Sequence, residues 1–316
     1  MSSKVLAMVF PGQGSQSVGM LAELATQFPE VKALFEEASQ VLHYDLWELV
    51  QNDPEQKLDQ TTYTQPALLV ADVAVWRCWL SQGGPRPSLL AGHSLGEYSA
   101  LVCAEALKFS EAVKLVSLRG KYMQEAVSPG EGAMAAIVGL DMPTLVELCA
   151  DASHHGVVSP ANYNSIGQTV VAGQTAAVER VVKEALAQGA RLAKILPVSV
   201  PSHCALMQSA ADHLKRSLEA VSLSTPKIPV VQNADVGIHD DPERIRALLV
   251  EQLISPVRWV ETIQLFAQKG IQLIIECGPS KVLTGLNKRI EPIPTIPVND
   301  SASLAGALAE CSTRGD

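Results

Sequence analysis

Residues 88–106 read SLLAGHSLGEYSALVCAEA and combine a short apolar segment, a glycine-rich turn and a helical pattern. The apolar segment, 88–91, predicts a buried strand, and 97–106 predicts a helix. Between them, Gly92, Ser94 and Gly96 match the nucleophile elbow G-x-S-x-G, in which a sharp strand-to-helix turn exposes the serine hydroxyl. We therefore expect Ser94 at a helix N-terminus, where free N–H groups favour negative charge. The five residues alone also fit a glycine-rich connector with a bystander serine.

Outside this stretch, short apolar strands alternate with longer helices. Residues 5–10 predict a strand that ends at a Pro-Gly turn, and helical patterns follow over 31–42 and 67–80. Further strands are expected near 228–232 and 272–276. This alternation predicts a parallel sheet that is covered by helices on both faces. With the elbow, it indicates an α/β-hydrolase-like subdomain.

The middle of the chain follows a different order of elements. It predicts a strand at 132–140, a helix at 143–152, strands at 156–163 and 169–172, a helix at 176–188 and a strand at 191–200. The order β-α-β-β-α-β is typical of a ferredoxin-like unit. We therefore predict a small ferredoxin-like subdomain, residues 128–198, inserted into a large α/β-hydrolase-like catalytic subdomain made of residues 1–127 and 199–316.

Composition and charge exclude several classes of protein. The 24 Lys and Arg against 33 Asp and Glu give a net charge of -9, with no basic cluster, which argues against nucleic-acid binding. The most apolar stretch, 66–80, is interrupted by Asp72 and Arg77 and falls short of the ~20 residues that span a bilayer. The six cysteines are scattered singly, which favours free thiols in a reducing cytoplasm over disulfides or a zinc site.

A serine nucleophile needs a base, and His203 is the best placed of the seven histidines. It follows a predicted strand and a Pro-Ser turn, and ligands of α/β sheets lie at the carboxyl ends of strands. His93 is adjacent to Ser94, so its side chain should diverge from the serine at a tight turn. No Asp or Glu obviously completes a triad. A backbone carbonyl could orient the imidazole instead.

Two other residues are candidates for the site. Gln13 follows the first predicted strand in a glycine-rich turn, where a backbone N–H could point at an oxyanion. The turn fails as a dinucleotide-binding fingerprint because position 17 is serine. Arg119 lies in an otherwise apolar helical stretch, and its rigid fork would suit a carboxylate. On the residues alone, a surface arginine beside Lys121 is the better interpretation.

The motifs together resemble a known family. The segments FPGQGSQ at 10–16, GHSLGEY at 92–98, RG at 119–120, VPSH at 200–203 and ECGP at 276–279 appear in order. These segments, in this order, resemble those of the malonyl-CoA:acyl carrier protein transacylases of bacterial type II fatty acid synthesis and of the acyltransferase domains of polyketide synthases. The resemblance extends over about residues 4–298. It implies an acyltransferase whose partners are malonyl-CoA and acyl carrier protein.

The resemblance also implies a role for each site residue. Ser94 would carry the malonyl group as an ester, with His203 as its base and later its acid. The backbone carbonyl of Gln252 would orient His203, and Arg119 would pair with the malonyl carboxylate. The backbone N–H groups of Gln13 and Leu95 would donate hydrogen bonds to the oxyanion. Gln13 would also contact the substrate. No cofactor is expected, because malonyl-CoA is a substrate and phosphopantetheine belongs to the carrier protein. No metal is expected either. No role is assigned to Asn233.

Three alternatives stay open. A serine hydrolase or thioesterase could use the same elbow, although Arg119 and the missing acidic triad member argue against it. A non-catalytic α/β module that binds an acyl carrier or a nucleotide would form no covalent adduct on Ser94. An acyltransferase with the same chemistry could also serve polyketide synthesis.

Overall fold

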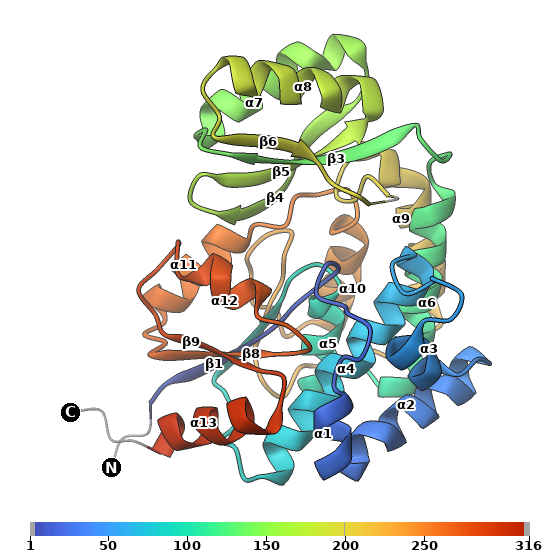
Figure 1. Ribbon diagram of the computed structural model, residues 1–316, viewed down its shortest axis with the longest axis vertical. Helices are drawn as coiled ribbons and strands as arrows, with labels where there is room; N and C mark the ends of the chain where they lie inside the picture. Colours follow the sequence, from blue (N-terminus) through green and yellow to red (C-terminus); the bar gives the residue numbers. More distant parts are fainter. Residues whose placement is uncertain (1–3, 199, 313–316) are drawn as a thin grey trace.

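A parallel five-stranded sheet forms the centre of the larger part of the molecule (Figure 1). The computed structural model describes residues 4–198 and 200–312. The strand order is β7–β2–β1–β8–β9, and every neighbouring pair is parallel, as predicted. The strands are β1 (Leu6–Phe10), β2 (Leu89–Gly92), β7 (Val230–Val231), β8 (Leu273–Cys277) and β9 (Thr295–Val298).

Helices cover both faces of this sheet. Met8 and Phe10 of β1 point into one hydrophobic cluster, and Ala7 and Val9 point into another on the opposite face. The helices of this part are α1 (Ala22–Gln27), α2 (Pro29–Leu42), α3 (Leu46–Asn52), α4 (Thr61–Ser81), α5 (Gly96–Cys103), α6 (Phe109–Glu125), η2 (Ala205–Met207), α9 (Gln208–Glu219), α10 (Pro242–Glu251), α11 (Trp259–Gln268), α12 (Val282–Asn287) and α13 (Ser301–Ser312).

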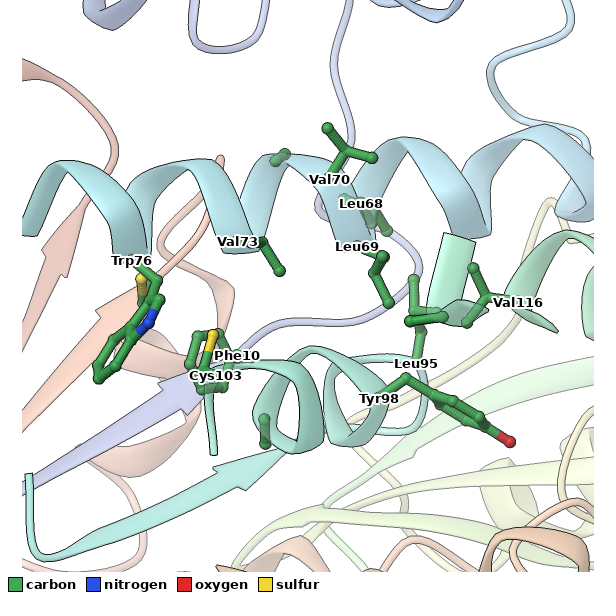
Figure 2. Close-up of a cluster of buried hydrophobic side chains, with 14 of the residues drawn as sticks. Phe10, Leu68, Leu69, Val70, Val73, Trp76, Leu95, Tyr98, Cys103 and Val116 are labelled. Atoms are coloured by element: carbon green, nitrogen blue, oxygen red, sulfur yellow. The ribbon is translucent and has the colours of Figure 1, made fainter. Parts of the chain in front are cut away.

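Helix α4 is buried along most of its length, because its sequence is apolar on all sides. Figure 2 shows Leu69 and Val73 of α4 pointing toward Phe10 of β1 and toward Leu95 and Tyr98 around the start of α5. This packing anchors the helix that follows the elbow. Among the described residues, no helix has the length and apolarity that would let it cross a bilayer.

A second sheet lies above the first, with its helices on the far side (Figure 1). Its order is β4–β5–β3–β6 and all its pairs are antiparallel. The β-α-β-β-α-β order is therefore the predicted one. The elements are β3 (Gly132–Val138), α7 (Met142–Ala152), η1 (Ser153–His155), β4 (Val158–Ser165), β5 (Gln168–Gln174), α8 (Thr175–Ala187) and β6 (Leu192–Ile195).

The bounds of the predicted strands agree to within two residues at each end except at β6, and β9 was not predicted; a proline lies at both places. The strand predicted over 191–200 is wrong beyond Ile195, because Pro197 cannot donate to the ladder; residue 199 lies outside the described part. Strand β9 was not predicted and contains Pro297, which a strand at the edge of the sheet tolerates. The small sheet lies within the predicted range 128–198, while the bounds of the two subdomains stay a prediction.

Candidate active site

The turn between β2 and α5 holds Ser94 in a left-handed backbone conformation, with φ at 53°. The flanking glycines are a steric requirement. A Cβ added at Gly92 would lie 1.8 Å from the carbonyl carbon of Gly96, and one at Gly96 would lie 2.1 Å from the carbonyl oxygen of Phe10. Larger residues at either place would force β1, β2 and α5 apart. The G-x-S-x-G spacing is therefore dictated by packing as well as by the exposed hydroxyl.

His203 lies within hydrogen-bond distance of Ser94. Its Nε2 is 2.8 Å from Ser94 Oγ, and its Nδ1 is 2.8 Å from the backbone carbonyl oxygen of Gln252. A carbonyl oxygen only accepts, so Nδ1 carries the hydrogen and donates it. Nε2 is then left to accept the Ser94 O–H. A backbone carbonyl thus occupies the place of the missing acidic residue.

The environment of His203 keeps its imidazole neutral. Burial lowers its pKa to about 3, and the nearby positive charge of Arg119 acts in the same direction. Only 3% of the residue is exposed. The imidazole is therefore in its proton-accepting form throughout the neutral range.

Arg119 lies inside the site, and the surface interpretation from the sequence is wrong. It is 1% exposed, and its Nη2 donates to Gln252 Oε1 at 2.9 Å and to Ser94 Oγ at 3.2 Å. The signal was in the helix periodicity, because Arg119 shares the buried stripe of α6 with Ala112, Val116 and Met123. Among the described residues its Nε has no hydrogen-bond partner and no carboxylate forms an ion pair with it. The buried cation is thus only partly satisfied by protein groups.

A pocket between the two sheets brings these groups together. Gln13 and Leu95 line it from the large sheet side, and Met134 and Val170 line it from the small sheet. Within the described chain, the backbone N–H groups of Gln13 and Leu95 donate to no protein acceptor. Both N–H groups are therefore free to donate, and their role as oxyanion donors, which the family resemblance implies, stays a prediction.

Asn233 was given no role from the sequence, yet it holds the elbow in place. Its Oδ1 accepts the Ser94 N–H at 2.7 Å, and its Nδ2 donates to the Gly92 carbonyl oxygen at 2.7 Å. Its own N–H donates to Oε2 of Glu97, a carboxyl group that is fully buried. The sequence signals for Glu97 are its place in the GHSLGEY segment at 92–98 and its charge in a helix whose other residues are uncharged.

None of the other histidines forms a hydrogen bond with Ser94 in the described part of the chain. His93 diverges from Ser94, and its Nε2 lies 2.8 Å from Oδ1 of Asn164 in β4. His239 is half-buried and contacts Asp235, and the remaining four are exposed: His43, His154, His155 and His213. Among the described residues, no group of three or more His, Cys, Asp or Glu is arranged to hold a metal ion.

Comparisons with known proteins agree on one family. The model of the acyl transferase domain matches residues 7–301. A malonyl CoA-acyl carrier protein transacylase of Salmonella typhimurium is 52% identical over 305 residues, 96% of this chain and 99% of that protein. The solved malonyl CoA-acyl carrier protein transacylase of Coxiella burnetii has a TM-score of 0.97 and 52% identity, covering 98% of this chain and 99% of that one.

A further solved structure includes a partner. It contains a malonyl-transacylase in complex with its type II polyketide synthase acyl-carrier protein. This chain is 55% identical to it with a TM-score of 0.95, over 96% of this chain and 99% of that one.

Proposed function

Because the chain belongs to the acyl transferase family and transfers malonyl groups from malonyl-CoA to acyl carrier protein, we propose that Ser94 carries the malonyl group as an ester between the two half-reactions. The observation that carries this proposal is the 2.8 Å contact between Ser94 Oγ and the unprotonated Nε2 of His203. A hydroxyl becomes a nucleophile when an adjacent base can take its proton.

In the first half-reaction, Ser94 Oγ attacks the thioester carbonyl carbon while His203 Nε2 takes the hydroxyl proton. The resulting oxyanion accepts hydrogen bonds from the free N–H groups of Gln13 and Leu95. When the carbon–sulfur bond breaks, His203 returns its proton to the sulfur of coenzyme A. The malonyl ester on Ser94 remains.

The second half-reaction reverses these roles with a different thiol. The phosphopantetheine thiol of the carrier gives its proton to His203, and its sulfur attacks the ester carbonyl. The bond between that carbon and Ser94 Oγ breaks, and His203 returns the proton to the serine oxygen. The carbonyl of Gln252 holds the imidazole in one tautomer through both steps. No cofactor enters this cycle.

Arg119 supplies the site for the carboxylate that distinguishes a malonyl from an acetyl group. Its guanidinium is buried, adjoins the nucleophile and has an unpartnered Nε, so a carboxylate bound there gains a pair with a desolvated cation. Gln13, which lines the same pocket, would touch the substrate as well.

Malonyl carrier protein made in this way supplies fatty acid synthesis. The relative bound to a polyketide carrier favours a second candidate, in which the same cycle loads a polyketide carrier. We place the reaction in the cytoplasm, which the six free cysteines fit.

The lifetime of the acylated enzyme tests the proposal against the hydrolase alternative. We expect the malonyl group on Ser94 to survive in water for many times the duration of one transfer, and to leave rapidly when phosphopantetheinylated carrier is added. Radiolabelled malonyl-CoA followed by rapid quenching measures both rates. Fast release of free malonate without carrier would identify a hydrolase instead.

A further inference from the structure

The carboxyl group of Glu97 lies buried behind the nucleophile and contacts two loops at once. Its Oε2 accepts the backbone N–H of Asn233 at 2.9 Å and Nε2 of Gln252 at 2.8 Å. Glu97 has no exposed surface, and Asn233 and Gln252 are each 1% exposed. Glu97 does not line the substrate pocket, so it acts on the reaction through its neighbours and not by touching substrate.

The contact with Glu97 determines which way the Gln252 amide points. Its Nε2 donates both to Glu97 Oε2 and to the Ser94 carbonyl oxygen, the latter at 3.0 Å. Both partners accept, so they select the NH₂ end of the amide. The oxygen end must then face Arg119, whose guanidinium can only donate and lies 2.9 Å away. A reversed amide would set donor against donor.

We propose that Glu97 is a positioning residue for malonyl selectivity, because it fixes the Gln252 side chain that aims Arg119 at the substrate carboxylate. This inference rests on the proposed role of Arg119. It assigns the side chain of Gln252 a task distinct from that of its backbone carbonyl, which orients His203. Gln252 thereby connects Arg119, which binds the substrate carboxylate, to the base His203.

The charges around Glu97 fit this role in either protonation state. Burial raises its pKa to about 7, although the hydrogen bonds from Gln252 and Asn233 and the charge of Arg119 lower it in part. Its Oε1 is buried without a partner, so a proton on that oxygen leaves Oε2 free to accept. The position and reach of the acceptor, and not its full charge, therefore fix Gln252.

Two substitutions of Glu97 separate the effect of its side-chain length from the effect of its charge. Glu97→Gln keeps the length of the side chain and one accepting oxygen, whereas Glu97→Asp keeps the charge but is one methylene shorter. We expect Glu97→Asp to narrow the ratio of kcat/KM for malonyl-CoA over acetyl-CoA by about tenfold or more, and Glu97→Gln to keep it within about threefold. Loading of Ser94 from each thioester by quenched flow gives both values.

Ser99→Ala is the matched control, because Ser99 is a buried polar residue of the same helix whose hydroxyl donates to Asp72 Oδ2 at 2.8 Å, away from the pocket. It should lower the melting temperature and leave the ratio unchanged. An unchanged ratio in Glu97→Asp, or a narrowing of the ratio that is equal in Glu97→Asp and Ser99→Ala, would overturn the proposal. A wild-type protein that forms no malonyl ester would instead overturn the proposed function.

Discussion

Replacing His203 with alanine lowers the rate at which malonyl-CoA acylates Ser94 by about 10²–10⁴-fold, the usual contribution of a positioned base. The Ser94 hydroxyl then keeps its proton during attack, and the coenzyme A sulfur leaves without a donor. The free N–H groups of Gln13 and Leu95 still stabilise the oxyanion, so a residual rate above that of water remains.

Rapid mixing with malonyl-CoA and measurement of released coenzyme A gives this rate directly. The His203→Ala protein should still bind malonyl-CoA, because Arg119 is unchanged. A rate within a few-fold of the wild type would assign the base to another group. An NMR titration adds a check: with a pKa near 3, the imidazole stays neutral as the pH falls from about 8 to 5. A midpoint near 6.5 would contradict the buried, neutral base.

Arg119→Ala removes most malonyl transfer and leaves acetyl transfer unchanged or faster. Burying the malonyl carboxylate unpaired costs several kcal/mol, which the guanidinium offsets in the wild type. With acetyl-CoA, the buried cation keeps no anionic partner and also lowers the pKa of His203. Bonds to charged groups are worth about 1.5–3 kcal/mol each, so we expect the preference for malonyl-CoA to narrow by about two orders of magnitude.

The test is kcat/KM for both thioesters in the wild type, Arg119→Ala and Arg119→Lys. Lysine should rescue malonyl transfer only in part, because a point charge does not reproduce the bidentate fork. If kcat/KM falls equally for the two substrates in Arg119→Ala, then Arg119 supports the fold or the coenzyme A moiety and does not recognise the carboxylate.

The residues close to Ser94 in the sequence could be predicted with a physical reason, because the elbow is a local structure. Two glycines, a preceding strand and a following helix determine it, and the steric contacts at Gly92 and Gly96 show why. The parallel sheet was predictable from the alternation of elements for the same reason. Each strand and helix is encoded in its own segment.

The supporting contacts could not be predicted in this way, because they join segments that are far apart in the chain. The bond from Asn233 Nδ2 to the Gly92 carbonyl spans 141 residues, and the bond from Gln252 Nε2 to Glu97 spans 155. No periodicity brings such pairs together. The burial of Arg119 was within reach, since its stripe on α6 is otherwise apolar, but an arginine by itself favours the surface.

Mass spectrometry of the intact protein after brief incubation with malonyl-CoA, followed by peptide mapping, tests the central claim most directly. The ester mechanism predicts one added malonyl group, located on Ser94, absent from Ser94→Ala and lost when carrier protein is added. An unmodified wild-type protein, or an adduct of undiminished yield in Ser94→Ala, would contradict it.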